Sequence, residues 1–178
     1  ASARYLGLPD ETRFVGRGYH TCATCDGFFY KNKNVIVVGG GDTAMEEAHH
    51  LAKLAASVTI IHRRDTFRAS KIMQDRVLKD PKIKVIWNTV IKELVGEKKV
   101  EKVVLQDITN QQTTEMPIDG VFVAIGYDPN VEFVQGKIDM NEFQNWANNY
   151  IQTLEANEQA DIQAVLNTLS VPDLNQDE

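Results

Sequence analysis

Hydrophobic residues in this chain alternate between short continuous runs and stripes at helical spacing. Residues 35–38 form a β-branched run that ends in a glycine-rich turn, and residues 58–61 form a second. Between the two runs, apolar residues recur at helical spacing from position 45 to position 55. Strands without polar alternation are typical of parallel sheets that are covered on both faces. The pattern therefore predicts a strand–helix–strand (βαβ) unit.

The same reading extends the unit toward residue 126. It predicts a helix at 68–78, a third strand at 83–87, two short strands at 90–95 and 100–107, a polar segment at 109–114, and a buried strand at 120–126. A charged turn at 96–99 joins the two short strands, whose alternation favours an antiparallel meander. The expected fold is an α/β Rossmann-type NAD(P)-binding domain with a parallel sheet and a small antiparallel meander, followed by an α-helical tail.

The last forty residues differ in pattern and in charge. Apolar positions at helical spacing over 143–154 and 162–169 predict two amphipathic helices. No Lys or Arg follows Lys137, so the net charge of -6 divides into about +2 before that point and about -8 after it. We therefore predict three parts: a crossover and dithiol segment at 1–33, a Rossmann-type domain at 34–137, and an acidic tail at 138–178.

Composition narrows the class of protein. Of the 178 residues, 43% are hydrophobic and 25% are charged, as in ordinary globular domains. The chain has no apolar run of membrane-spanning length and its first residues lack the layout of a signal peptide, so we expect a soluble, cytoplasmic protein that does not bind membranes. The acidic tail argues against nucleic acid as a partner, because phosphate contacts require clustered cations.

The glycine turn after the first strand fits the pattern GxGxxA. Gly39 permits the tight turn, Gly41 lets the backbone approach a pyrophosphate, and Ala44 allows close packing of helix on strand. The pyrophosphate would lie at the start of the helix, where the dipole favours negative charge. An ordinary glycine-rich turn is the alternative, but the strand before it and the helix after it favour a dinucleotide.

Basic residues follow the second strand, where NAD-binding units usually carry an acidic residue for the ribose. The chain has His62, Arg63 and Arg64 there, with Arg68 one helical turn further. Guanidinium groups bind a 2′-phosphate that a carboxylate would repel, so this pattern favours NADPH over NADH. A solvated basic patch is the alternative interpretation.

Cys22 and Cys25 are the chain's two cysteines, spaced as CxxC. Zinc would need two further ligands that the sequence does not supply nearby, so we expect no metal site. A purely structural disulfide would close a loop too short to stabilise the fold much. A redox-active dithiol is therefore favoured, on a short helix whose N–H groups point at the first sulfur. Asp26 could carry protons for the thiols, or serve only as a turn or cap residue.

Four ordered motifs together resemble the NADPH domain of the low-molecular-weight thioredoxin reductases of bacteria and plants. They are CATCDGFF at 22–29, GGGDTAMEEA at 39–48, HRRDTFRA at 62–69 and FVAIG at 122–126. The opening residues ASARYLGL also look like that family's crossover from its FAD domain. The resemblance covers residues 1 to about 138.

This resemblance implies that NADPH reduces FAD, that the flavin reduces the CxxC disulfide, and that the dithiol reduces thioredoxin or a thioredoxin-like protein after a rotation of the NADPH domain. A homodimer is one assembly it allows. By resemblance Cys22 would attack thioredoxin, Cys25 would face the flavin and Asp26 would be the acid/base. The implied cofactor-binding residues are Gly39, Gly40, Gly41, Asp42, Thr43, Ala44, His62, Arg63, Arg64, Arg68, Ile125 and Gly126.

The sequence lacks the two FAD-binding segments expected on either side of such a domain. We therefore expect the chain to supply the NADPH site and the dithiol but not the flavin site, and to turn over little thioredoxin alone. Two alternatives stay open: an NADPH-binding or regulatory module that acts with a separate flavoprotein, and an inactive fragment.

Overall fold

The computed structural model describes residues 1–128 and 130. The chain divides into two compact units, Ala1–Pro129 and Asn130–Glu178, and all the described helices and strands belong to the first. The two amphipathic helices predicted for the tail lie outside the described residues. The boundaries predicted at residues 33 and 137 stay predictions.

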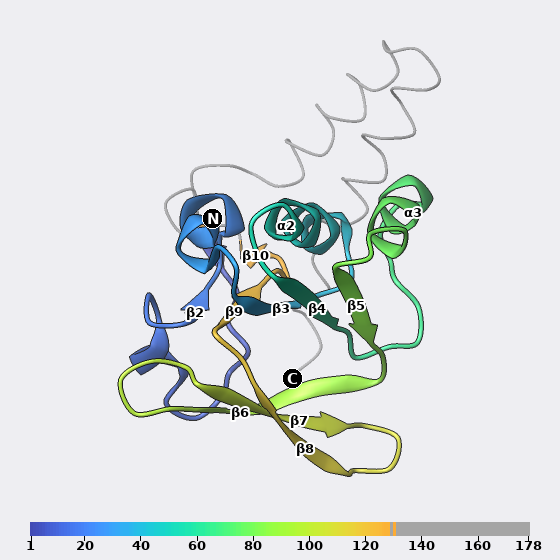
Figure 1. The fold of residues 1–178 in the computed structure, drawn as a ribbon. Helices are drawn as coiled ribbons and strands as arrows, with labels where there is room; N and C mark the ends of the chain where they lie inside the picture. Colours follow the sequence, from blue (N-terminus) through green and yellow to red (C-terminus); the bar gives the residue numbers. More distant parts are fainter. Residues whose placement is uncertain (129, 131–178) are drawn as a thin grey trace, which may run out of the picture. The chain divides into compact units, whose positions relative to one another are not determined.

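A five-stranded parallel sheet forms the centre of the first unit (Figure 1). Its strand order is β2-β9-β3-β4-β5, and the strands are β2 (Tyr19–His20), β3 (Asn34–Val38), β4 (Ser57–Ile61), β5 (Ile83–Ile86) and β9 (Gly120–Val123). β3 is followed by α2 (Asp42–Ala52), which leads into β4 in parallel register from Asn34 opposite Ser57 to Val38 opposite Ile61. The predicted βαβ unit is confirmed.

The sheet is covered on both faces, which explains why its central strands are apolar throughout. α1 (Ala23–Asp26), α2 and α3 (Lys71–Leu78) lie on one face, and the smaller sheet lies on the other (Figure 1). Along β3, Val35 and Val37 join the core under the helices, whereas Ile36 and Val38 join the core toward the smaller sheet. Alternate side chains of one strand thus fill two cores.

The smaller sheet is an antiparallel meander of β6 (Thr89–Val95), β7 (Lys102–Asp107) and β8 (Thr113–Pro117). The first two strands are as predicted. β8 falls partly in the segment that was read only as polar, because four of its five residues are exposed and it has no apolar face to reveal it. Its backbone pairing with β7, from Gln106 opposite Thr113 to Lys102 opposite Pro117, makes it a strand.

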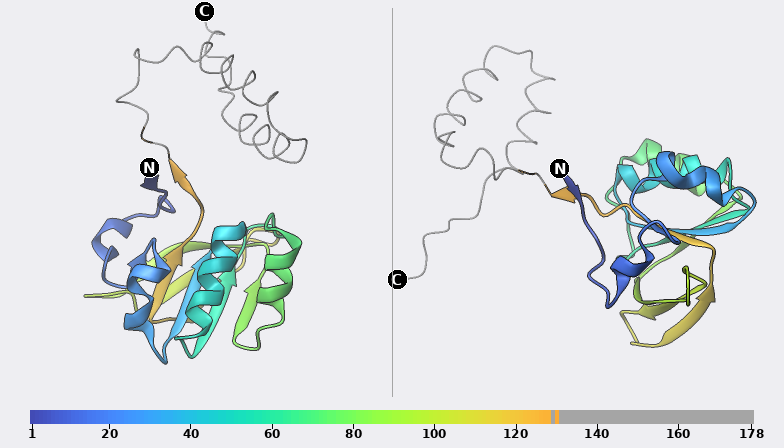
Figure 2. Two further views of the ribbon diagram at one scale, coloured as in Figure 1. Left: turned by 90° about the horizontal axis from the view of Figure 1, so that it is seen from above. Right: turned by 90° about the vertical axis from the view of Figure 1, so that its left-hand side faces the viewer.

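Two further differences from the predicted elements come from contacts distant in sequence. α3 begins at Lys71 rather than near residue 68, because the backbone N–H groups of Arg68 and Ala69 donate to the Gly40 carbonyl oxygen and hold this stretch as a loop. The chain ends of the unit also pair, as β1 (Ser2–Ala3) lies antiparallel to β10 (Tyr127–Asp128) (Figure 2). Short 3-10 helices η1 (Glu11–Phe14) and η2 (Gly27–Tyr30) complete the unit.

The strand order places a topological switch point between β3 and β9. From β3 the chain winds outward through β4 to β5, and it then returns through the meander to β9 on the other side of β3. In open α/β sheets, ligands bind at the carboxyl ends of the strands beside such a point. Among residues 1–128 and 130, every helix is too short or too polar to span a bilayer.

Candidate functional site

A cavity of about 490 Å³ lies at the carboxyl ends of β3, β4 and β9. The predicted cofactor residues that line it are Gly39, Gly40, Gly41, Thr43, His62, Arg63, Arg64, Arg68, Ile125 and Gly126. These residues come from three separate turns that the parallel sheet brings to one edge. The structure therefore gathers ten of the twelve predicted residues around one hollow.

The three glycines of the turn meet different surroundings. A Cβ on Gly39 would lie 2.4 Å from the Ala124 carbonyl oxygen and 2.8 Å from the Ala44 Cβ, and the Gly39 φ is +154°. A Cβ on Gly40 would lie 2.2 Å from the His62 ring. A Cβ on Gly41 would have nothing within 4 Å. Gly39 and Gly40 are thus required by packing, while Gly41 leaves the open approach that a phosphate could occupy.

Three exposed arginines provide the positive charge of the cavity. Arg63 and Arg64 follow β4 and Arg68 comes one turn later. Within the described part of the chain, none of their guanidinium groups makes an ion pair or a side-chain hydrogen bond. A guanidinium prefers bidentate contact with phosphate or carboxylate, so this set could hold a phosphate group.

His62 lines the cavity from a buried position. It is 7% exposed, its Nε2 lies 3.0 Å from the Thr66 carbonyl oxygen, and its ring contacts Phe67 and Trp87. Burial lowers the pKa of His62, and the charges of the neighbouring arginines lower it further. A neutral imidazole wedged beneath Gly40 can support the glycine turn, but it contributes little positive charge to a phosphate site.

Two predicted residues do not line the cavity. Ala44 is fully buried against Gly39, as its packing role requires. Asp42 is exposed, and its Oδ1 accepts hydrogen bonds from the Ser70 backbone N–H at 2.8 Å and the Ser70 hydroxyl at 2.9 Å. Asp42 therefore ties the start of α2 to the loop that carries the arginines.

Other wall residues were missed because no local signal marks them. Arg4 reaches the cavity from the N-terminal segment, where it also forms an ion pair with Asp128 at 2.6 Å. Thr89, Val90 and Ile91 contribute from the start of β6. These positions meet the glycine turn only through the tertiary fold.

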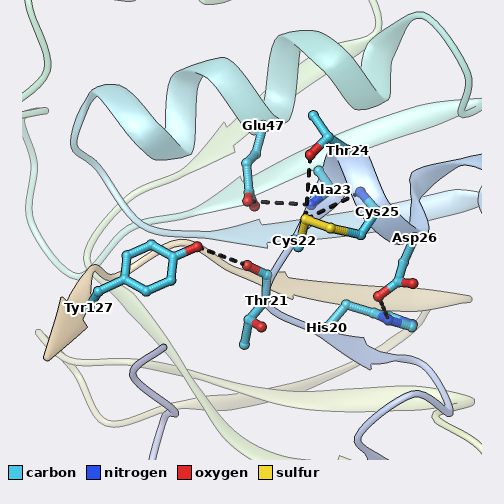
Figure 3. The surroundings of a disulfide bond; sticks show 9 residues. All are labelled: His20, Thr21, Cys22, Ala23, Thr24, Cys25, Asp26, Glu47 and Tyr127. Carbon is cyan, nitrogen blue, oxygen red and sulfur yellow. Dashed lines mark hydrogen bonds and ion pairs between the residues drawn. A yellow bond between two sulfur atoms is a disulfide. The ribbon is translucent and has the colours of Figure 1, made fainter. Parts of the chain in front are cut away.

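Cys22 and Cys25 form a disulfide at the start of α1 (Figure 3). Cys22 is the N-cap residue, and its Sγ accepts a hydrogen bond from the Cys25 backbone N–H at 3.2 Å. The predicted short helix with an N–H group directed at the first sulfur is confirmed. Cys22 is half-buried and Cys25 is exposed, so an external thiol reaches the second cysteine more readily.

Asp26 takes part in a chain of hydrogen bonds that runs away from the disulfide. Its Oδ2 lies 2.7 Å from His20 Nδ1, and His20 Nε2 lies 2.7 Å from the Tyr30 hydroxyl. Burial, with smaller contributions from Asp26 and Asp119, raises the pKa of Tyr30 to about 12, so this phenol keeps its proton at neutral pH. The sequence reading did not single out His20 or Tyr30 as partners of Asp26.

Glu47 is a second carboxyl group beside the disulfide (Figure 3). It comes from α2, and its Oε1 accepts a hydrogen bond from the Ala23 backbone N–H at 3.3 Å. Its Oε2 is buried with no hydrogen-bond partner among the described residues. Burial raises the pKa of Glu47 to about 7. Buried carboxyl groups with raised pKa values are frequent at functional sites.

Two exposed aromatic side chains lie on η2, which directly follows the short helix at the disulfide. Phe28 is 72% exposed and Phe29 is 67% exposed, with ring centroids 6.5 Å apart. Adjacent exposed aromatic rings are uncommon on a free surface and are typical of contact sites for other molecules.

The comparisons agree with this combination of a cavity lined by glycines and arginines and a disulfide. The family model "Pyridine nucleotide-disulphide oxidoreductase" matches residues 1–158. The chain belongs to this family, whose description joins the two features found here in one unit.

Within this family the chain is similar to thioredoxin reductases. It is 49% identical over 138 residues to the thioredoxin reductase of Streptomyces coelicolor, and the aligned region covers 78% of this chain and 43% of that relative. It is 44% identical over 176 residues to that of Rickettsia conorii, covering 97% and 55%. The structure of thioredoxin reductase from Lactococcus lactis matches with a TM-score of 0.74 and 42% identity, covering 76% of this chain and 45% of that chain.

The matches also show how much of each relative this chain covers and how far along the chain the similarity runs. The chain spans about half the length of the curated relatives it matches. The family model and the Rickettsia relative both extend past residue 138, where the recognised motifs end. Part of the acidic tail therefore shares the resemblance.

Proposed function

We propose that this chain is the NADPH-binding, disulfide-bearing part of a thioredoxin-disulfide reductase. The observation that carries the proposal is the presence, in one compact unit, of open space at Gly41, three arginines around it that have no ion-pair partner among the described residues, and a disulfide followed by Asp26. Membership of the pyridine nucleotide-disulphide oxidoreductase family supports the same reading.

The cavity residues fit NADPH in charge and shape. The pyrophosphate would lie over Gly41 and Thr43 at the start of α2, where backbone N–H groups and the helix dipole favour anions. Arg63, Arg64 and Arg68 would bind the 2′-phosphate. Ile125 and Gly126, at the end of β9, would line the remaining wall.

When bound, NADPH supplies a hydride and FAD passes its two electrons to a disulfide. The flavin would come from another part of the protein or from a separate chain. In this chain, Cys22 and Cys25 would accept the two electrons as their S–S bond opens. Asp26 would supply a proton to a departing thiolate, and the N–H of Cys25 would stabilise negative charge on the Cys22 sulfur.

The partner of the dithiol would be thioredoxin or a thioredoxin-like protein in the cytoplasm. The reduced pair would pass its electrons to that partner's disulfide by thiol–disulfide exchange, with Cys22 as the attacking thiol. Phe28 and Phe29 would form an apolar contact surface for the partner beside the reacting sulfurs.

Coenzyme preference tests the cavity. NADPH should bind at least about tenfold more tightly than NADH, because a hydrogen bond to a charged group contributes about 1.5–3 kcal/mol. Replacing Arg63 and Arg64 together by Gln should remove this preference without weakening NADH binding, as measured by calorimetry. Equal affinities for both coenzymes in the unaltered chain would refute the assignment of the arginines.

Trapping of mixed disulfides tests the dithiol. The Cys25→Ser chain should form a mixed disulfide with oxidised thioredoxin, whereas the Cys22→Ser chain should form far less, as seen by non-reducing electrophoresis. The opposite result would exchange the roles of the two cysteines, in line with the greater exposure of Cys25 in the oxidised form. No trapping by either variant would count against thioredoxin as the partner.

The second candidate function is an NADPH-binding or regulatory module that works with a separate flavoprotein. The observation in its favour is that the chain spans about half the length of its relatives. If this candidate function is correct, the affinity-tagged chain, purified from the organism that produces it, should co-purify with a second polypeptide that is yellow from bound flavin. A flavin absorbance band retained by the isolated chain itself would instead favour the complete reductase activity.

A further inference from the structure

The hydrogen bonds behind Asp26 centre on His20, a residue that the proposed function leaves unused. His20 is 7% exposed and lies on β2, where it pairs with Phe122 of β9. Its ring stacks on Phe122 with centroids 5.1 Å apart and meets the Tyr30 ring edge-on at 5.2 Å. Stacking on Phe122 and the edge-on contact with Tyr30 therefore fix the orientation of the imidazole.

Both ring nitrogens of His20 are engaged, and this assigns the protons. An ionised carboxylate only accepts, so the 2.7 Å contact between Asp26 Oδ2 and His20 Nδ1 requires a proton on Nδ1. In the neutral ring, Nε2 then accepts from the Tyr30 hydroxyl, 2.7 Å away. If Nε2 gains a proton, it donates and the Tyr30 oxygen accepts. His20 can thus change its charge without losing either hydrogen bond.

The far end of this chain is also fixed. Tyr30 is 7% exposed and its ring lies against Gly120, where a Cβ would come within 2.3 Å. Lys33 lies over the Tyr30 ring, with Nζ 5.3 Å from the centroid. The groups around His20 are therefore Asp26 from α1, Tyr30 from η2 and Phe122 from β9. Of these, Asp26 directly follows the exposed cysteine.

We propose that His20 is a positioning residue for the disulfide chemistry: it fixes the carboxylate of Asp26, the residue that follows Cys25, and shares the proton that Asp26 exchanges with the thiol. The acid/base group would then be the Asp26–His20 pair, with Tyr30 anchoring the imidazole. This inference rests on the proposed dithiol function but not on bound NADPH or flavin. The structure shows the hydrogen bonds that join Asp26, His20 and Tyr30, and the proton transfer between Asp26 and a cysteine sulfur is the step that the proposal adds.

The reaction that the pair serves can be written with dithiothreitol as the reductant. A dithiothreitol thiolate attacks one sulfur, the Cys22–Cys25 bond breaks, and the released thiolate takes a proton. The second dithiothreitol thiol then attacks the mixed disulfide and closes a cyclic disulfide. In total, two electrons and two protons pass from dithiothreitol to the cysteine pair. The pair would deliver the proton to the released thiolate and regain it from solvent.

The first experiment measures the rate of this reduction at pH 7 with the full chain alone. Samples are quenched with a maleimide and weighed by mass spectrometry. His20→Phe keeps an aromatic ring but loses both nitrogens, and it should slow reduction by about tenfold, a fraction of what a full general acid contributes. His20→Asn can still donate to Asp26 and should recover most of the rate. Tyr30→Phe should slow it by about twofold to threefold.

Outcomes against the proposal are distinct from failure of the proposed function. If His20→Phe stays within twofold of the unaltered chain while Asp26→Asn slows at least tenfold, Asp26 acts alone and the proposal is wrong. If Asp26→Asn has no effect, both the Asp26 role and the His20 proposal fail, while NADPH binding by the same chain remains a separate test of the cavity.

A spectroscopic measurement on the unaltered chain covers the case in which His20→Phe does not fold. Nitrogen-15 spectra of the imidazoles should show the Nδ1–H form for His20 in the oxidised protein. Its signals should shift when dithiothreitol reduces the disulfide, while those of His49 and His62 stay in place. An Nε2–H tautomer, or His20 signals that do not change when the disulfide is reduced, would overturn the proposal.

Discussion

The walls of the cavity come from turns that end buried parallel strands, whereas the disulfide lies on a four-residue helix with its second cysteine exposed. Around the cavity, backbone geometry dominates: Gly39 and Gly40 leave no room for a side chain. Around the disulfide, side chains from separate elements dominate: Glu47 from α2, His20 from β2 and Tyr30 from η2. A turn without room for side chains thus shapes the cavity, whereas the surroundings of the disulfide depend on partners that three other elements supply.

The sharpest test of whether backbone geometry shapes the cavity compares substitutions at two glycines of the same turn. Gly39→Ala should lower the free energy of unfolding by about 2–4 kcal/mol, because its Cβ collides with the Ala124 carbonyl and the backbone is strained. Gly41→Ala is the matched control, since its Cβ meets nothing within 4 Å, and it should cost only about 0.5–1 kcal/mol, because alanine is a poorer N-cap residue than glycine. Urea denaturation measures both.

The same pair should separate stability from binding. Gly41→Ala should weaken NADPH binding more than its small loss of stability would suggest, because its methyl group would occupy the space proposed for a phosphate. Equal loss of stability in both variants would contradict the assignment of Gly39 to packing and of Gly41 to binding.

The surroundings of the disulfide, which are formed by side chains, should instead make the free energy of unfolding depend on pH through Glu47. Its pKa is raised from 4.5 to about 7, so between these values the folded chain binds more protons than the unfolded chain. The free energy of unfolding should therefore fall as pH rises through this window. Glu47→Gln should remove the fall and raise stability at pH 8 by about 1–2 kcal/mol, less than the full shift implies because solvent partly screens the group.

Glu46 provides the matched control, because it is the exposed neighbour on the same helix. Glu46→Gln should leave the pH dependence as it is. Thermal unfolding from pH 4.5 to pH 8 measures all three chains. A Glu47→Gln profile parallel to that of the unaltered chain would show that another group controls this window.

Exposed aromatic residues beside the disulfide should affect the partner and not the fold. Replacing Phe28 and Phe29 by Ser should slow electron transfer from the reduced dithiol to thioredoxin by about tenfold, which corresponds to about 1.4 kcal/mol of lost contact. Ile72→Ser is the control, since Ile72 is 73% exposed on α3. Stability and NADPH binding should stay unchanged. A similar slowing by Ile72→Ser would remove the special role of the aromatic pair.

The smallest expected effect concerns Asp42, which links the two halves of the cavity edge through Ser70. Asp42→Ala should cost about 0.5–1 kcal/mol of stability, because the bonds are exposed. NADPH binding should weaken only about twofold to threefold, since the arginine loop keeps its bonds to Gly40. Calorimetry would detect a larger loss, which would place Asp42 in direct contact with the cofactor.

Much of the cavity could be predicted from the sequence, because the motifs that form its walls each depend on residues close together in the chain. The β-branched runs, the GxGxxA spacing and the arginines after β4 each act within a few residues of one another, and parallel strands bring their carboxyl ends together. The third meander strand was not predicted, because the exposed residues of β8 carry no hydrophobic period and only pairing with β7 orders them.

The amino-acid sequence alone determined the fold class, the strands around the glycine turn and the pairing of two cysteines with a nearby carboxylate. These depend on short-range sterics and on periodicity, which a sequence displays directly. Only the tertiary structure decided that Asp26 bonds to His20, that Glu47 accepts from the Ala23 backbone N–H with its other carboxyl oxygen buried, and that Arg4 reaches the cavity. Burial and long-range contact set those properties, because the partner of each group lies on another element.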